Sequence, residues 1–426
     1  MMSEHLYDSQ RCAAQWPFPE VDLTDLTLFG QGFPHHVFTQ LRQSGAALYH
    51  PTTSLTPDNE GFWVFTRYQD ILLLAKDIDT FSSQSGGDRT GGGTMIEDLP
   101  CAAGPGSVIN MMDDPRHKAL RRLMAPGITR GRIAALEPIL TVAARQAVVS
   151  ALAKGEGDFV SDIAAELPLF AIAHLVGIPP EDRHSIYGWI NAVLDYADRQ
   201  LGQSSVSSQQ GMQQFMAYAQ RFVEKRRQAP GDDIVSLAIV GELSAELGRL
   251  TPTEQVMVFS VVMVAGLETT RNAIAGGILA FIQHPEQWAL LQREPTRMNR
   301  ALEEILRWTS PTPYNRRTAT RDVEVAGKLI KAGEKVTLWW ASANRDEQQF
   351  ENPFAFDIGR EKNAHLAFGS GGHGCLGAQL AILEMRVIFR ELLNHVNTFS
   401  LTGPVEWVRS NKHTGIRRMP LRYSGL

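Results

Sequence analysis

The chain has 426 residues, of which 43% are hydrophobic and 20% charged, as is typical of a globular protein with a sizeable core. Its formal net charge of -5 excludes the strongly basic surface that general nucleic-acid binding requires. The three cysteines, Cys12, Cys101 and Cys375, are few and far apart, which argues against a disulfide framework and fits a reducing compartment.

No segment looks like a targeting or membrane-spanning sequence. Residues 1–17 are polar and lack the apolar core of a signal peptide. The most apolar run, 256–267, is too short to cross a bilayer and is interrupted by Ser260. We therefore expect a cytoplasmic protein without a transmembrane anchor.

The N-terminal third is predicted to mix short strands and helices. Segments 47–50 and 61–66 have the pattern of a hairpin, and 68–76 is predicted to be a helix. Segment 82–106 is rich in glycine and serine. It predicts a long irregular loop, a kind of loop that is often functional.

Helical spacing dominates from about residue 115 to residue 283. Segments 130–153 and 158–176 carry apolar residues three and four apart, as helices with one buried face do. The polar stretch 201–211 predicts a break between two helices. Beyond this region the chain returns to predicted strands, 334–340 and 397–401, around one more helix, 376–395.

One predicted helix is unusually long. Thr251, Pro252 and Glu254 supply an N-cap, a proline at the first helical position and a glutamate at the third. The helix should run to about residue 283, a length of about 45–50 Å. Its first half is apolar on nearly all faces, so it should be buried. Residues 1–426 are therefore expected to form one domain, mainly α with a minor β region.

The segment 368–377, FGSGGHGCLG, is the most informative part of the sequence. Five glycines in ten residues allow positive φ angles and a close approach to a flat group. Cys375 comes just before a predicted helix, and a helix N-terminus lowers a thiol pKa and favours the thiolate that binds metals. The segment therefore favours an iron–thiolate site.

Three other interpretations of this segment remain open. A lone cysteine is often only a small buried residue. Gly369-x-Gly371-x-x-Gly374 also matches the dinucleotide-binding pattern, although the helix that follows leaves no room for the required sheet. A zinc site would need four ligands, and only His373 and Cys375 are close together.

Four motifs along the chain resemble those of the cytochrome P450 haem-thiolate enzymes, over nearly the whole sequence from about residue 34. They are, in chain order, Ala265-Gly266-Leu267-Glu268-Thr269-Thr270, Glu304-Ile305-Leu306-Arg307, Ala343-Asn344-Arg345-Asp346 with the downstream segment 352–357, and the cysteine loop. The resemblance implies that family's fold, with haem b between the long helix and the cysteine-loop helix. It implies Cys375 as the axial ligand, with no covalent flavin or second metal.

One position departs from the family's pattern. Ala355 stands where many members have arginine or histidine. The group that completes a structural network with Glu304 and Arg307 is therefore open, and Arg345 is a candidate.

The resemblance also implies roles for individual residues. Glu268 and Thr269 would relay protons to dioxygen during O–O cleavage. A helix N-cap or a solvated helix face is the alternative, which the apolar surroundings oppose. Expected at the haem propionates are His117, Arg121, Arg317 and His365, for each of which a solvated charge is the alternative. Expected against the rest of the cofactor are Ala265, Phe368, Gly369 and Gly377.

The implied reaction is hydroxylation of an unactivated C–H bond with dioxygen, two electrons and two protons. Segments 166–169, 265–273 and 284–288 resemble bacterial members that act on steroids, terpenoids or branched alkyl chains. The substrate pocket is expected among the 82–106 loop, the helices around Ala192 and Gln214, residues 261–265 and 313–314, and the 412–414 turn. A peroxide-driven peroxygenase and a non-catalytic haem carrier or sensor are alternatives; the Glu268-Thr269 pair opposes the first.

The electrons are expected to come from another protein. The sequence has no convincing flavin or nicotinamide site and no second cysteine cluster for iron–sulfur. The resemblance implies a ferredoxin or flavodoxin with its NAD(P)H-dependent reductase. Candidates for a basic docking patch are Arg116, Lys118, Arg122 and Lys362, with plain solubility as the alternative. We expect a monomer.

Overall fold

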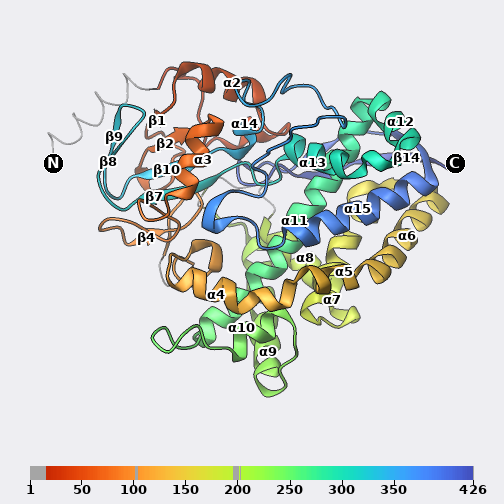
Figure 1. Cartoon of the computed structure of the whole chain (residues 1–426), viewed down its shortest axis with the longest axis horizontal. Coiled ribbons are helices and arrows are strands. Elements are labelled where there is room, and N and C mark those ends of the chain that lie inside the picture. Colours follow the sequence, from red (N-terminus) through yellow and green to blue (C-terminus); the bar gives the residue numbers. More distant parts are fainter. Residues whose placement is uncertain (1–15, 101–103, 195–200, 202, 426) are drawn as a thin grey trace.

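The computed structural model describes residues 16–100, 104–194, 201 and 203–425 (Figure 1). Cys12, Cys101 and nearly all of the segment 1–17 lie outside the described residues. Helices dominate the middle of the chain, and the largest sheet combines three strands from the N-terminal third with two from residues 315–338. The fold is mainly α with a minor β region, as the sequence predicts.

Helix α11 (Pro252–Gln283) is the long helix that the sequence predicts, with the predicted start and end. The Thr251 hydroxyl accepts a hydrogen bond from the Glu254 N–H, and the Glu254 carboxylate accepts one from the Thr251 N–H at 2.7 Å. This capping box fixes the first turn. Helix α11 packs against α7 (Glu166–Val176), α9 (Val206–Gln228), α10 (Ile234–Val240), α12 (Pro285–Arg293), α13 (Met298–Thr309) and α15 (Ala378–His395).

Two predicted helical segments differ from the structure. Segment 130–153 is two helices, α5 (Arg130–Ala135) and α6 (Glu137–Lys154), because Pro138 at the start of α6 cannot continue the hydrogen bonds of the preceding turn. Segment 158–176 begins with the end of β6 (Glu156–Asp158) and a π-turn, Val160–Ala164, before α7.

The predicted break over 201–211 is also shorter than expected. The Ser205 hydroxyl accepts a hydrogen bond from the Ser208 N–H and starts α9 at Val206, so residues 206–211 are helical. The hydrogen bond of the Ser205 N-cap therefore starts a helix in a stretch whose polar composition favoured a loop. The remaining helices are α2 (His35–Ser44), α3 (Tyr68–Lys76), α4 (Arg116–Met124), α8 (Arg183–Leu194) and α14 (Trp340–Ala343).

The largest sheet has five strands in the order β1-β2-β10-β7-β3. The predicted hairpin is β1 (Leu48–His50) with β2 (Phe62–Phe65), which pair antiparallel. Strand β10 (Lys335–Leu338) runs parallel to β2 and antiparallel to β7 (Asn315–Ala319). It therefore connects the N-terminal hairpin to a strand that lies about 250 residues further along the chain. Strand β3 (Phe81–Ser82) forms the far edge.

Smaller sheets complete the β region. Their strands are β4 (Gly91–Gly92) with β5 (Leu99–Pro100), β8 (Val323–Val325) with β9 (Lys328–Ile330), β12 (Glu406–Trp407) with β13 (Ile416–Arg418), and β11 (Val396–Leu401), β14 (Pro420–Gly425) and β6. Segment 82–106 holds only the short pair β4–β5 and the end of β3, as expected for an irregular loop.

Two apolar clusters meet along α11. Its first half packs with α9 and α10, and its second half packs with α6, α13 and α15. Within the described residues, no individual helix has the length and hydropathy needed to cross a membrane. The segments 116–135 and 137–154 would reach that length and hydropathy only if taken together, and they are bent by 63° relative to each other.

Candidate active site

Cys375 lies in the turn between the short 3₁₀ helix Gly371–His373 and α15. Its N–H donates to the Phe368 carbonyl at 2.8 Å, which closes the loop on itself. Gly369 and Gly371 have φ angles of +69° and +73°. A Cβ on Gly371 would lie 2.6 Å from the Ala75 carbonyl oxygen in α3, so only glycine fits there.

The surroundings of the Cys375 sulfur correct one expectation. Burial raises the pKa of the Cys375 thiol above its ordinary value, and the Gly377 N–H and the charge of Arg121 only oppose this. The predicted lowering by the helix start is therefore outweighed, and it takes a bound metal ion to remove the proton outright. The side chain nevertheless has solvent-accessible surface, so an incoming group can reach the sulfur from one side.

Four basic side chains from separate parts of the chain gather beside this loop. The rings of His117 in α4 and His373 stack with centroids 3.9 Å apart. Arg121, one turn further along α4, donates to the Gly374 carbonyl at 2.8 Å. Arg317 in β7 belongs to the same cluster, because its charge acts on His373.

His117 Nδ1 lies 3.1 Å from the Asp114 carboxylate, whereas Arg121, Arg317 and His373 form no ion pair with any described residue. Burial lowers the pKa of Arg317 to about 10, and only Asp113 opposes this. Burial, reinforced by the charges of Arg317, His117 and Arg121, lowers the pKa of His373 to about 2. Arg317 donates to one backbone carbonyl, and its Nε has no partner. Such a site calls for carboxylates, so these residues fit the two propionates of a haem.

His365 is not part of this cluster, contrary to expectation. Its Nε2 lies 3.0 Å from the Glu303 carboxylate, and its Nδ1 accepts the Ala367 N–H at 3.2 Å. Both ring nitrogens therefore have partners within the protein. His373 takes its place, and its position two residues before Cys375 was the signal for it in the sequence.

The acid–alcohol pair lies in the middle of α11, which continues through it without a break. The Thr269 hydroxyl donates to the Ala265 carbonyl at 2.9 Å, and Ala265 is exposed although most of the helix is buried. Glu268 is buried, and one of its oxygens accepts from Arg271 at 2.6 Å and from Asn272 at 3.0 Å. The acid and the alcohol therefore have separate hydrogen-bond partners.

A flat group would find room between the cysteine loop and α11. A Cβ on Gly377 would meet no atom within 4 Å, and one on Gly369 would meet only the His373 carbonyl oxygen, at 3.9 Å. Phe368, at the start of the loop, is only partly buried. Leu376, next to the cysteine, packs against the apolar cluster that includes the first half of α11. Thiolate, glycines, exposed alanine and basic cluster together fit haem.

The Glu304–Arg307 network, which the sequence left open, is completed by a residue other than the candidate Arg345. Arg345 does not bind Glu304; it donates to the carbonyls of Arg307 and Trp308. Arg360 supplies the missing cation, with its Nε 3.2 Å from the Glu304 carboxylate. Position 355 contributes to the network through its backbone, because the carbonyl of Ala355 accepts hydrogen bonds from both Arg307 and Arg360. The alanine side chain at this position is therefore compatible with the network.

Three of the expected pocket walls meet at Lys412. Its ammonium group donates to the carbonyls of Thr94 and Tyr314 and to the Asn315 side chain, at 2.8 to 3.0 Å. Burial lowers the pKa of Lys412 to about 7, although Glu97 opposes this. The 82–106 loop, the segment after α13 and the 412–414 turn are thus tied together.

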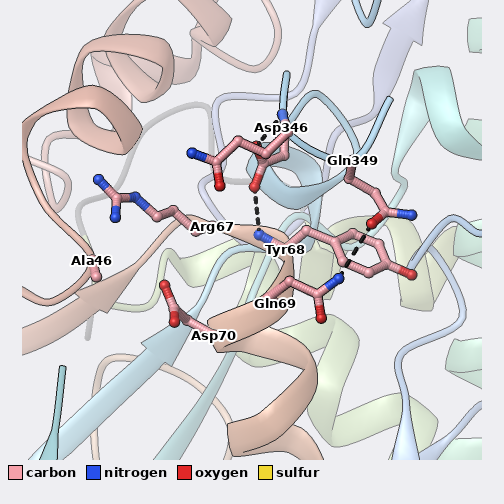
Figure 2. Close-up of a pocket in the computed structure, with 8 residues that line it drawn as sticks. Ala46, Arg67, Tyr68, Gln69, Asp70, Asp346 and Gln349 are labelled. Atoms are coloured by element: carbon pink, nitrogen blue, oxygen red, sulfur yellow. Dashed lines mark hydrogen bonds between the residues drawn. The ribbon is translucent and has the colours of Figure 1, made fainter. Parts of the chain in front are cut away.

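Two surface features complete the description. A polar hollow beside α3 is lined by Arg67, Asp70 and Asp346, where the Tyr68 N–H donates to Asp346 at 2.7 Å (Figure 2). It contains no residue of the cysteine loop. In the expected basic patch, Arg116 is held by an ion pair with Glu254, whereas the others, Lys118, Arg122 and Lys362, are exposed.

Comparisons with known proteins show which family the chain resembles. The cytochrome P450 family model matches residues 182–416. The chain is 41% identical to cytochrome P450 126 of Mycobacterium tuberculosis, over 95% of this chain and 98% of the relative. It is 35% identical to the steroid C26-monooxygenase of Rhodococcus jostii, over 97% of this chain and 87% of the relative. A solved cytochrome P450, CYP268A2 of Mycobacterium marinum in complex with pseudoionone, superposes with a TM-score of 0.85 at 32% identity, covering 95% of this chain and 99% of the other.

Proposed function

The chain belongs to the cytochrome P450 family of haem-iron monooxygenases, and we propose that it hydroxylates an unactivated C–H bond of an apolar small molecule. The proposed substrates are steroids, terpenoids or branched alkyl chains. Relatives at 35% identity named for steroid C26 oxidation and for ω-hydroxylation of methyl-branched lipids support this class.

The residues that would hold haem b are those that gather around the cysteine loop. Cys375 would be the axial ligand, and the propionates would bind among His117, Arg121, Arg317 and His373. Ala265 and Gly377 are small enough to lie against the ring faces. When bound, the haem supplies the activation of dioxygen and the one-electron chemistry.

The protein's own part in the reaction is to deliver protons. The observation that carries the proposal is that Glu268 is a buried acid, with one oxygen to which no described residue donates a hydrogen bond, next to a threonine on a mainly apolar helix. The free Glu268 oxygen can accept a proton from a water chain, and the Thr269 hydroxyl can pass one on after it leaves the Ala265 carbonyl.

The electrons would come from a ferredoxin or flavodoxin and its NAD(P)H-dependent reductase. Lys118 and Arg122 in α4 and Lys362 before the cysteine loop are exposed and would attract an acidic carrier. We further propose that the protein acts as a cytoplasmic monomer and that the chain forms one domain.

The test is isotope incorporation by the haem-loaded protein. Purified enzyme, a ferredoxin, its reductase and NAD(P)H would be incubated under ¹⁸O₂ with a panel of steroids, terpenoids and branched alkanes. We expect a product that carries one ¹⁸O atom, analysed by mass spectrometry. Cys375→Ser should abolish both the product and the thiolate-type spectrum of the reduced carbon monoxide complex.

The same experiment separates the alternatives. A Thr269→Ala variant that keeps full peroxide-driven turnover, with no response to any reductase, would identify a peroxygenase instead. A haem carrier would be favoured by two results together. The protein would show an intact haem spectrum that no compound of the panel shifts, and no compound would be converted into product with any reductase.

A further inference from the structure

Three buried polar atoms to which no described residue forms a hydrogen bond lie around Lys412. They are Thr94 Oγ1, Glu97 Oε2 and His413 Nδ1. The Lys412 ammonium group donates to the Thr94 carbonyl at 2.8 Å. The charge of Lys412 also acts on both Glu97 and His413. The three side chains therefore form one group, which we call the polar cluster, although they come from loops that are distant in the sequence.

Lys412 supports this cluster and has no hydrogen left to donate. An ammonium group has three hydrogens, and Lys412 donates to the carbonyls of Thr94 and Tyr314 and to the Asn315 side chain. Its nitrogen also lies 4.6 Å from the centroid of the Tyr314 ring. Lys412 thus ties the surrounding segments together, and an incoming group would have to bind the atoms of the polar cluster instead.

The polar cluster borders the interior of the protein rather than its outer surface. Glu97, Lys412 and His413 each keep some accessible surface. Burial nevertheless raises the pKa of Glu97 and lowers those of Lys412 and His413 to about 7 and about 4. Cys375 combines accessible surface with a strong effect of burial in the same way, at the point where haem would bind.

The cluster also lies between two walls of the candidate active site. The charge of Glu268, in the middle of α11, acts on His413. The charge of Arg317, in the basic group beside the cysteine loop, acts on Lys412. A molecule held between α11 and the cysteine loop would therefore pass close to the polar cluster.

The unpartnered atoms indicate that a ligand completes the cluster. Buried polar atoms in folded proteins are nearly always hydrogen-bonded, and those that are not destabilise the protein. Binding pockets for small molecules are mainly apolar, with a few polar groups that fix the orientation of the ligand. A hydrogen-bonding group on the ligand would satisfy Glu97 and His413 at the same time as it oriented the rest of the molecule.

A hydroxyl group matches this cluster in every protonation state of its members. The raised pKa of Glu97 makes both the acid and the carboxylate accessible, and a hydroxyl can accept from the first or donate to the second. His413 is a neutral ring at neutral pH, with one nitrogen that donates and one that accepts. A hydroxyl is compatible with either nitrogen.

Other common substituents match less well. A ketone only accepts hydrogen bonds, so it would leave the carboxylate form of Glu97 without a donor. An ammonium group only donates, and it would be repelled by Lys412 and Arg317. A carboxylate would be repelled by Glu97, and the hydrogens of Lys412 are already in use.

We infer that Glu97 and His413 form a binding site for a hydroxyl group of the substrate, and that this contact selects which C–H bond is presented for oxidation. The inference rests on the proposed function. It narrows the proposed substrates to steroids or terpenoids that already carry a hydroxyl group, and it disfavours plain alkyl chains.

The test compares matched ligands on the haem-loaded full chain. A steroid with one hydroxyl group is set against the corresponding ketone and the deoxy compound, and a terpenoid alcohol against its parent hydrocarbon. Titration calorimetry and the haem spectrum give the dissociation constants. We expect each hydroxyl compound to bind about 10- to 100-fold more tightly than its deoxy partner, with the ketone between them.

Four variants assign this preference to the cluster. Glu97→Leu should reduce the preference for the hydroxyl compound to less than about threefold, because only apolar surface remains there. Glu97→Gln should retain most of it, since an amide both donates and accepts. His413→Phe keeps a flat ring without nitrogens and should reduce the preference by about tenfold. Glu324→Leu is the matched control, because Glu324 in β8 is exposed, and it should leave the preference unchanged.

The distribution of products gives a second measurement. With the parent protein, the hydroxyl compound should be oxidised mainly at one carbon, and the deoxy compound at several. In Glu97→Leu the hydroxyl compound should give the mixed pattern as well, because its orientation is no longer fixed.

The outcomes separate this inference from the proposed function. If the parent binds hydroxyl and deoxy compounds equally, or if Glu97→Leu and His413→Phe keep the parental preference, the polar atoms bind only ordered water and the inference fails. If Glu97→Leu does not fold, His413→Phe and Glu97→Gln decide by the same measurements. If the preference depends on the cluster but no compound is converted into product, the binding site stands and the proposed function fails.

Discussion

Two buried ion pairs in this protein have the same chemistry and the same spacing but different surroundings. Glu304 and Arg307 in α13, and Glu268 and Arg271 in α11, each place a carboxylate three residues before an arginine. Around Glu304, both oxygens accept hydrogen bonds, from Arg307 and in addition from Asp357, Arg360 and Asn363. Around Glu268, Arg271 and Asn272 both donate to one oxygen, and no described residue donates to the other.

The difference separates a structural pair from a functional one. A buried pair with every polar atom satisfied has one stable arrangement, and it fixes α13 against the segment 344–363. A buried pair with unsatisfied atoms has a second arrangement within reach. We therefore expect mutations in the first pair to change stability and mutations in the second to change turnover.

The largest expected effect is on stability, in Arg307→Met. Glu304, at 0% exposure, would lose the cation that binds both of its oxygens and keep only the weaker pair with Arg360, which costs about 3–5 kcal/mol of the free energy of unfolding. Urea unfolding of the haem-loaded protein measures it. The control is Arg132→Ala, which breaks an exposed ion pair with Asp232 and for which we expect a change of less than about 1 kcal/mol. If Arg307→Met lost no more stability than this control, the Glu304–Arg307 pair would not be a structural pair.

The next effect is on catalysis, in Glu268→Gln. The amide keeps the shape and can still accept from Arg271, so the free energy of unfolding should change by less than about 1 kcal/mol. Product formation should fall by about 10²-fold, because the amide cannot carry a proton. Rates at saturating substrate, together with peroxide release, measure this. Unchanged turnover would show that Glu268 has no part in proton delivery.

A third arginine extends the comparison, because Arg317 forms no ion pair with any described residue and donates only to the Arg316 carbonyl. Replacing it with leucine should stabilise the haem-free protein by about 1 kcal/mol, since the buried charge that lowers its pKa to about 10 is removed. The same change should weaken haem binding by about tenfold, the equivalent of one charged hydrogen bond. Haem titration and unfolding of the haem-free protein measure the two effects; a destabilised haem-free variant would contradict this account of Arg317.

The smallest effect concerns His413 beside the Glu268 pair. Burial lowers its pKa to about 4 in the folded protein, so between pH 4 and the ordinary pKa of 6.5 the unfolded chain binds the proton more readily. Stability should therefore rise with pH across this window, and His413→Asn should lose that dependence, a difference on the order of 1 kcal/mol. Urea unfolding of parent and variant at pH 4.5 and pH 7 compares them; equal pH dependence would show that His413 is not buried as a neutral ring.

Much of the candidate site was accessible from local sequence patterns. The glycines at 369 and 371 with Cys375, the capping box that begins α11, and the apolar run around Glu268 and Thr269 each depend on neighbours within a few residues. Such patterns can be recognised without knowledge of the fold, because the backbone conformation that they require is local.

The incorrect predictions about the site concern partners distant in the sequence. His365 was assigned to the propionate cluster, but Glu303 reaches it from α13. Arg345 was a candidate for the network with Glu304, but Arg360 donates the hydrogen bond. The thiol pKa was judged from the helix start alone, whereas burial by residues from several elements outweighs it. No spacing rule gives the direction of a long side chain across a packed interface.

The sequence alone therefore determined the fold class, the long buried helix and the cysteine loop, because turn geometry, capping and apolar periodicity are properties of short segments. Only the tertiary structure decided which charges meet, that His373 joins Arg317, and that Arg271 joins Glu268 to Asn191 across two helices. The physical reason is that hydrogen bonding and desolvation depend on distances of a few ångströms, and packing brings residues 80 positions apart to 2.7 Å.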